Sequence, residues 1–297
     1  MSTAVELRAR WWSMSFDSLP IKQDWRTTPN RTVAAAGTQF AYRQLGSGRG
    51  VPVVLLNHWG ANLDNFDPTV VNALSADRPV FLLDYRGVGR SGGRAPLSVA
   101  AMAHDVVAVI AELRLVEVDL IGFSLGGFVA QQIVLDAPHI VRRIVPAGTG
   151  PARGEAIDQV GAVSLPLILK NAVRFRDPKH SLFFPHTSAG QAAARAFLDR
   201  LKERVLDRDK PVGPLTFLRQ LKAIKAWGRQ PPQPLEMLQL PVLVVNGDHD
   251  IMVPTSNSET LVDRIPGSRL VIYPNAGHGS IFQYHSAFIA EVKKFFA

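Results

Sequence analysis

The stretch Asp119–Phe128, DLIGFSLGGF, passes from a short apolar run through a serine flanked by glycines into a helical pattern. Gly122, Ser124 and Gly126 form the arrangement G-x-S-x-G. Between a strand and a helix this arrangement favours a sharp, strained turn, because only glycine leaves the backbone room two residues either side of the serine. Such a turn lifts the serine hydroxyl clear of the backbone. The stretch therefore predicts a nucleophilic serine, and a serine that merely caps the helix is the simpler alternative.

Strand-like and helical patterns alternate on both sides of this unit. Runs such as VPVVLLN (51–57), RPVFLLDY (78–85) and LPVLVVNGD (240–248) are typical of buried strands, and segments with helical spacing separate them. This alternation predicts an α/β fold in which a doubly wound, mostly parallel sheet is covered by helices on both faces.

The alternation stops after residue 150, where proline, phenylalanine and basic helical stretches take over up to residue 234. We therefore expect an N-terminal arm at 1–31, a core at 32–150 and 235–297, and a helical lid at 151–234. The arm contains several tryptophans. It is expected to pack on the body or on a partner subunit, with anchoring at a membrane surface as the alternative.

The basic surplus of the chain lies in the predicted lid. The net charge is +8, and residues 151–234 hold 15 Lys and Arg against 7 Asp and Glu. The acids are interspersed among the bases, as in DRLKERVLDRDK, and no nucleic-acid-binding module accompanies them. The pattern is typical of solvated helix faces, and no nucleic-acid partner is expected.

The chain contains no cysteine, which excludes thiol nucleophiles, thiolate metal sites and disulfides and favours a cytoplasmic location. No apolar run approaches the roughly 18 residues needed to span a bilayer, so stable membrane insertion is not expected. We expect no metal and no organic cofactor. A homo-oligomer is compatible with the sequence, which does not specify the oligomeric state.

A serine hydroxyl becomes a good nucleophile only when a base removes its proton and a third group orients the base. After one predicted strand, VVNGDHDIMVP offers Asp248 and Asp250, and after the last strand YPNAGHGSIF offers His278. The chain order is then Ser, Asp, His, as expected for such a triad on a doubly wound sheet. The residues alone leave Asp248 and Asp250 open as the acid.

From about residue 32 to its end the chain resembles the α/β-hydrolase superfamily, on the motifs GFSLGG, LLDYRGVGRSG, NGDHDIMVP and NAGHG. The likeness is to its esterase, lactonase and cofactor-free haloperoxidase branches. It implies an eight-stranded sheet with a helical lid between strands 6 and 7. It also implies a triad of Ser124, Asp250 and His278, with Asp248 structuring its own loop.

The resemblance further implies an oxyanion hole made by the backbone amides of Trp59 and Leu125. Here Asn57-His58 replaces the usual His-Gly. His58 must therefore either adopt backbone angles that favour glycine or belong to a slightly different loop. We expect the Trp59 ring to form a wall of the pocket. The pocket candidates are His58, Phe123, Phe183 and Phe184, with Leu165, Leu167 and Phe175 as further walls contributed by the lid.

The function predicted from these features is hydrolysis of a carboxylic ester or lactone, small to medium in size and largely apolar, through an acyl-enzyme on Ser124. Branches that carry aspartate at this position are disfavoured. Cleavage of C–C bonds and perhydrolase or haloperoxidase activity on the same triad are alternatives within the enzyme class. A non-catalytic ligand receptor on the same fold is the alternative from a different class.

Overall fold

The computed structural model describes residues 24–297, so most of the predicted arm lies outside the described residues. Its centre is one sheet of eight strands in the order β1-β2-β4-β3-β5-β6-β7-β8. The strands are β1 (Arg31–Ala35), β2 (Thr38–Leu45), β3 (Val53–Leu56), β4 (Val80–Leu83), β5 (Val118–Phe123), β6 (Val141–Ala147), β7 (Leu243–Gly247) and β8 (Arg269–Tyr273). Only β1–β2 and β2–β4 pair antiparallel. The predicted eight-stranded, mostly parallel sheet is confirmed.

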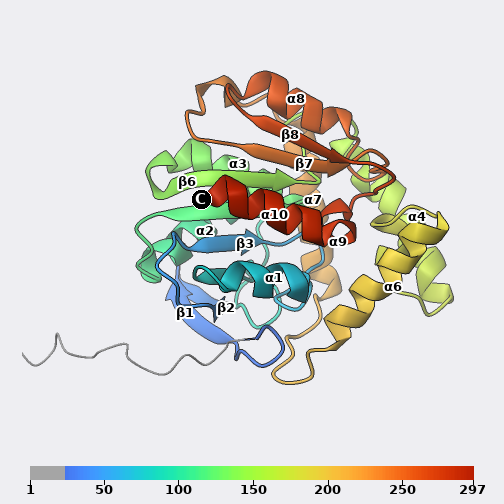
Figure 1. Cartoon of the computed structure of the whole chain (residues 1–297), viewed down its shortest axis with the longest axis horizontal. Coiled ribbons are helices and arrows are strands. Elements are labelled where there is room, and N and C mark those ends of the chain that lie inside the picture. The colour runs from blue at the N-terminus through green and yellow to red at the C-terminus, as the bar shows by residue number, and fades with distance from the viewer. Residues whose placement is uncertain (1–23) are drawn as a thin grey trace, which may run out of the picture.

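Helices cover both faces of the sheet. The helices of the core are α1 (Pro68–Ser75), α2 (Val99–Glu112), α3 (Leu125–Asp136), α8 (Ser256–Arg264), α9 (Ser280–Gln283) and α10 (His285–Phe296). Helices α1 and α10 pack together on one face, and α2 packs beside α3 on the other (Figure 1). The central strands read as continuous apolar runs because both of their faces are buried.

The order of the strands determines where loops can meet. Strand β3 lies between β4 and β5, and all three run parallel. After β3 the chain forms β4 on one side of that strand, and it later forms β5 on the other side of the same strand. At such a switch point the loops after the two strands diverge and leave a crevice outside their carboxyl ends, the usual ligand site of doubly wound sheets. The loop after β3 and the turn at Ser124 flank this crevice.

Four helices lie between β6 and β7 in the chain, as α4 (Val160–Val173), α5 (Lys179–Leu182), α6 (Ser188–Lys202) and α7 (Pro214–Arg229). In Figure 1, α4 and α6 stand beyond the ends of the strands, to one side of the sheet. We call α4 to α7 the inserted helices. Their action as a lid, and the division of the chain into separate domains, stay predictions. Within residues 24–297 no helix combines the length and the apolar character needed to cross a bilayer.

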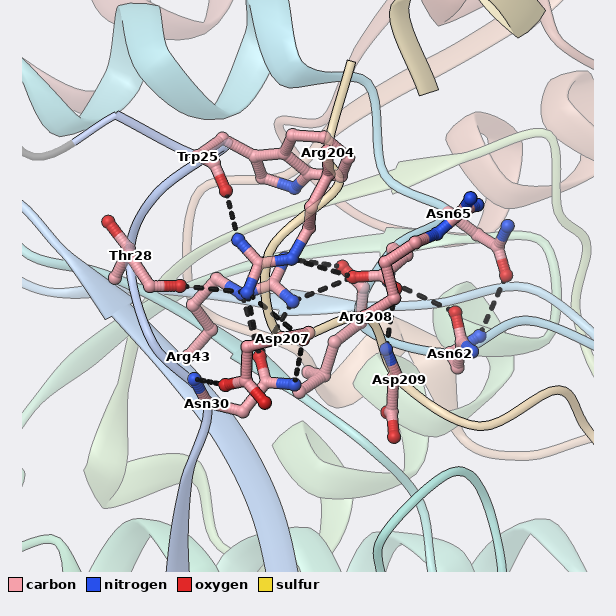
Figure 2. Close-up of polar contacts among 12 residues, drawn as sticks. Trp25, Thr28, Asn30, Arg43, Asn62, Asn65, Arg204, Asp207, Arg208 and Asp209 are labelled. Atoms are coloured by element: carbon pink, nitrogen blue, oxygen red, sulfur yellow. Dashed lines mark hydrogen bonds and ion pairs between the residues drawn. The ribbon is translucent and has the colours of Figure 1, made fainter. Parts of the chain in front are cut away.

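A buried ionic cluster fastens the inserted helices to the core. Arg43 on β2 and Arg204 just after α6 are both fully buried, and both approach the same carboxylate oxygen of Asp64, at 2.7 and 3.3 Å. Both guanidinium groups also lie over the indole ring of Trp25, 5.5 and 5.8 Å from its centroid (Figure 2). Burial lowers the pKa of Arg43. Burial and the neighbouring Arg43 charge lower the pKa of Arg204 to about 10, so Arg204 remains charged at neutral pH.

The same cluster holds the first described residues of the chain. Arg204 donates hydrogen bonds to the carbonyl oxygens of Trp25 and Thr28, at 2.5 and 2.9 Å. Arg43 donates to the side-chain oxygen of Asn30 at 2.6 Å. Three segments far apart in the sequence thus meet around two buried positive charges (Figure 2).

We expect Asp64→Asn to destabilise the protein by about 3–5 kcal/mol, because it leaves two buried guanidinium groups without their shared carboxylate. Urea unfolding at pH 7 measures the change in the free energy of unfolding. Asp199→Asn is the matched control, since Asp199 forms an exposed ion pair with Lys202 and its loss should change stability by less than about 0.5 kcal/mol. Equal effects of the two substitutions would contradict the assigned role of Asp64.

Candidate active site

Ser124 occupies a strained turn between β5 and α3. Its backbone angles are φ 58° and ψ −117°, a region that L-residues rarely adopt. Four hydrogen bonds hold it there. The Ser124 amide donates to the Ala147 carbonyl at 2.8 Å. The Ser124 carbonyl accepts from the amides of Gly127 and Phe128, at 2.8 and 3.3 Å, and from the Thr149 hydroxyl at 3.0 Å. The predicted strand–turn–helix unit is confirmed, and the Ser124 side chain forms no cap hydrogen bond.

The two flanking glycines are required by close backbone approaches. A Cβ atom on Gly126 would collide with the carbonyl oxygen of Leu56 on β3, and one on Gly122 would collide with the carbonyl oxygen of Gly126. The pattern G-x-S-x-G therefore allows α3 to start directly against the sheet. The amide of Leu125, the first residue of α3, then lies at the helix N-terminus, where the helix dipole favours negative charge.

His278 and Asp250 come together from the loops after β8 and β7. The Nδ1 atom of His278 lies 2.7 Å from Oδ2 of Asp250, and both side chains are completely buried. The other carboxylate oxygen of Asp250 accepts from the amides of Met252 and Val253, at 2.8 and 2.9 Å. The carboxylate is therefore held by its own loop while it orients the imidazole ring.

Asp248 contacts different groups. It accepts a hydrogen bond from the amide of Ala276 at 3.1 Å, and it lies 2.6 Å from the ring of His249, a side chain that is largely exposed. Asp250 contacts His278, and Asp248 braces the loop that carries His278. The contact between Asp250 and His278 agrees with the arrangement that the family resemblance implied, whereas the Asp248 carboxylate bonds to the loop of His278 and was expected to structure its own loop.

Ser124 and His278 line one small cavity of about 90 Å³, together with His58 and Trp59. The Nε2 atom of His278 is buried and has no hydrogen-bond partner among residues 24–297. This nitrogen is therefore free to accept a proton from a group inside the cavity, and the Ser124 hydroxyl is one of the donors in the lining. No cluster of three or more histidine or acidic side chains suited to a metal ion occurs in the described part of the chain.

His58 is buried and neutral. Its Nδ1 atom lies 2.8 Å from the carbonyl oxygen of Trp59, so it carries the proton and donates. The ring lies edge-on to Phe123 and Phe183, at 5.4 and 5.0 Å between centroids. Desolvation, with the nearby charge of Lys179, lowers the pKa of His58 to about 3. The side chain thus braces the Trp59 peptide group and does not carry charge.

The loop after β3 accommodates His58 without glycine-like backbone angles. The residue with a positive φ, 73°, is Gly60. A Cβ atom there would come 2.9 Å from the Phe217 ring. His58 could either have adopted backbone angles that favour glycine or have belonged to a slightly different loop, and the structure shows the second.

Helix α7 closes over this loop. The Trp59 ring stacks on the Phe217 ring at 4.2 Å, and its Nε1–H donates to the Phe217 carbonyl at 2.8 Å. The Gly60 amide donates to the side chain of Gln220 at 2.9 Å. The expected Trp59 wall is present, and an inserted helix fixes its position.

The structure divides the predicted pocket residues into two groups. Phe183 and His58 line the cavity, whereas Phe123 lies beneath it, 5.0 Å from the His278 ring. Phe184 is wrongly assigned, because it turns away and packs on Phe197 of α6.

The two predicted walls from α4 are wrong, because Leu165 is 41% exposed and Leu167, although half-buried, does not line the cavity. Phe175, beyond the end of α4, does not line the small cavity either, but it lines the larger cleft beside it. The error has a simple origin, since α4 carries apolar residues on all sides and its sequence does not show which side faces inward.

Several lining residues were not expected from the sequence: Ile168, Pro178, Lys179, Leu182, Phe217 and Met252. No motif marks them. They reach the cavity only because the inserted helices fold back over the strand ends. Gly60, Lys179 and Phe217 also line a neighbouring cleft of about 720 Å³, so the small cavity opens beside a much larger one.

We expect His58 to make the protein less stable in acid. Its pKa is about 6.5 in the unfolded chain and about 3 when folded, so the unfolded state binds the proton and stability falls as pH drops below 6.5. Between pH 7.5 and 5.0 this contributes a loss of about 2 kcal/mol. His58→Asn keeps a donor for the Trp59 carbonyl and should remove that part of the loss in urea unfolding. The exposed control His104→Asn should not, and an equal effect would contradict the neutral state of His58.

Comparisons with known proteins agree with this architecture. The family profile of the alpha/beta hydrolase fold matches residues 51–283. The chain is 29% identical over 263 residues to a pimeloyl-[acyl-carrier protein] methyl ester esterase from Pectobacterium atrosepticum, covering 86% of this chain and 97% of that protein. Among solved structures, an alpha/beta hydrolase fold protein from Chitinophaga pinensis superposes with a TM-score of 0.86 at 34% identity, over 92% of this chain and 98% of that one. A hydrolase from Pseudomonas aeruginosa gives 0.71 at 25% identity, over 90% and 98%.

The profile spans most of the described residues, and the six parallel strands β3 to β8, the strained serine turn and the loops after β3, β7 and β8 lie within it. The chain therefore belongs to the alpha/beta hydrolase fold family.

Proposed function

We propose that the protein is a serine hydrolase that cleaves a carboxylic ester or lactone through an acyl-enzyme on Ser124. The observation that carries the proposal is the shared cavity. It holds Ser124 on a strained turn and the free Nε2 atom of His278, whose other nitrogen is held by Asp250 at 2.7 Å. A nucleophile, a base and an orienting acid are the three parts that serine catalysis requires.

In the first half of the proposed reaction, the Ser124 hydroxyl transfers its proton to Nε2 of His278 while its oxygen bonds to the acyl carbon. The carbonyl oxygen becomes an oxyanion, which the amides of Leu125 and Trp59 stabilise. Collapse of this intermediate breaks the bond to the leaving oxygen. The proton on His278 passes to that oxygen, and the acyl group stays on Ser124.

In the second half, water replaces the alcohol. His278 takes one proton from the water, the resulting oxygen bonds to the acyl carbon, and the bond to Ser124 breaks as its oxygen regains the proton. Asp250 keeps the Nδ1–H of His278 directed toward itself and stabilises the imidazolium in both halves. The buried setting strengthens that interaction because little water screens it.

The relatives support ester chemistry. The similar protein from Pectobacterium atrosepticum, 97% of which is covered by this chain, is named for cleavage of a methyl ester. A second esterase of that name, from Aeromonas hydrophila, is 28% identical to this chain over 257 residues. A small inner cavity beside a large cleft suits an ester with one short arm and one longer arm. We propose that the short arm is the acyl group and that it occupies the cavity between Leu182 and Met252.

The triad is tested by p-nitrophenyl ester hydrolysis and fluorophosphonate labelling. Ser124→Ala should abolish labelling and lower kcat/KM by about 10⁴-fold or more, and Asp250→Asn should lower kcat by about 10²–10⁴-fold through loss of the oriented imidazole. Asp248→Asn is the matched control and should stay within about twofold of wild type, since Asp248 does not touch His278.

A wild-type protein that neither labels nor turns over any activated ester would overturn the proposal in favour of a non-catalytic receptor. Turnover of a meta-cleavage-type diketone well above that of all esters and lactones would favour the C–C hydrolase alternative. Peracid formation that exceeds hydrolysis would favour the perhydrolase alternative.

The size of the inner cavity predicts acyl-chain selectivity. Across p-nitrophenyl esters we expect kcat/KM to be highest for short acyl groups and to fall by about tenfold or more for long ones. Each methylene group that does not fit the cavity raises the free energy of the transition state by about 1 kcal/mol. Leu182→Ala should move the optimum to longer chains. Leu169→Ala, on the outer side of α4, is the control and should leave it unchanged. An optimum unaffected by Leu182→Ala would contradict the placement of the acyl group.

A further inference from the structure

Helix α4 has its apolar residues on the outside. Leu165, Leu169 and Val173, four residues apart, share one face of the helix and are 41%, 67% and 73% exposed. Val163 is 38% exposed, and Phe175, just beyond the helix end, is fully exposed. A surface helix ordinarily directs such a stripe toward the core.

The inward side of α4 mixes apolar and polar residues. Its buried residues are Val160, Gly161, Ser164 and Asn171, and the side chain of Asn171 donates to the hydroxyl of Ser181 at 3.0 Å. The neighbouring helix α6 follows the usual pattern and buries Phe197 and Leu201. The outward apolar face of α4 therefore does not reflect a general lack of packing in the inserted helices.

Basic side chains border the apolar face. Lys170 is on α4 and Arg174 caps its C-terminal end, and with Arg176 they line a surface cleft of about 320 Å³ that also contains His180 and His186. None of the side chains that line this cleft is a carboxylate. Within residues 24–297, neither Arg174 nor Arg176 forms an ion pair, so their charges face solvent.

We propose that the outer face of α4, together with this basic cleft, docks on an anionic phospholipid surface. Aliphatic and aromatic residues flanked by Lys and Arg on one helix form the composition of an interfacial helix, which buries its apolar face at the boundary of the acyl chains and pairs its cations with headgroup phosphates. A second copy of the chain fits less well. A two-fold interface through α4 would bring the basic borders of both copies together.

Docking would place the catalytic cavity next to the membrane. Ile168 extends from the inner side of the same helix into the cavity that contains Ser124. An ester dissolved in the lipid would then have a short path to the site, a consequence that rests on the proposed function. Docking itself does not depend on catalysis, so a binding assay tests it separately.

The test is sedimentation of the full chain with vesicles, either pure phosphatidylcholine or phosphatidylcholine with phosphatidylglycerol, at about 0.05 and about 1 M NaCl. We expect binding to the anionic vesicles at low salt and at least about tenfold weaker binding at high salt or to neutral vesicles. Leu169→Gln/Val173→Gln and, separately, Lys170→Gln/Arg174→Gln should each weaken binding by about tenfold or more.

Val116→Gln is the matched control. Val116 is 88% exposed and precedes β5, at the opposite end of the strands from the cavity, so its substitution should leave binding unchanged. Thermal unfolding and hydrolysis of a water-soluble ester check that each variant is folded, because none of the substituted residues lines the catalytic cavity or the large cleft beside it.

Three results would overturn the proposal. The first is no binding to anionic vesicles at low salt. The second is binding that the Leu169/Val173 variant retains in full, which would assign it to another surface. The third is a dimer in analytical ultracentrifugation that this variant dissociates while vesicles bind neither protein, which would make the outer face of α4 an interface between copies.

Discussion

The backbone of Ser124 imposes the constraint on which the site depends. A residue at φ 58° and ψ −117° is stable only where its surroundings compensate for the strain, and here the Ala147 carbonyl and the Thr149 hydroxyl do so. The turn also needs α3 to begin against β3, a contact that only glycine at position 126 allows. One strained residue thus sets the register between a helix and the centre of the sheet. The same turn presents the hydroxyl and the Leu125 amide to one small space.

The inserted helices complete what the sheet begins. The core supplies the serine turn and the loops that carry Asp250 and His278. Helix α7 holds the Trp59 loop, and Phe183, the residue that follows α5, packs against the ring of His278. These helices are attached through a buried carboxylate, Asp64, that is shared by two guanidinium groups. Such a cluster stabilises the folded protein only while all its members are present. The same charges therefore hold both the inserted helices and the first described residues of the chain.

The fold and the polar centre of the site were predictable, because both leave local patterns in the sequence. Buried strands appear as apolar runs, and close backbone approaches appear as glycines around Ser124. The pair of His278 and Asp250 was predictable in part, since residue order restricted the acid to two neighbouring aspartates. The apolar lining was not predictable. Phe184 and Phe183 are adjacent and chemically identical, and only the path of the chain after α5 directs one to the cavity and the other to Phe197.

The sequence by itself determined the α/β sheet, the strained serine turn and the order of the three polar groups, because each depends on residues close together in the chain or on the fixed directions of parallel strands. Only the tertiary structure decided that Asp250 meets His278, that His58 stays neutral beside Phe183, and that α4 directs Leu165 and Leu169 to solvent. These features depend on which surfaces are in contact. A helix that is apolar on every side can be buried on any of them, and its neighbours in space decide which face is covered.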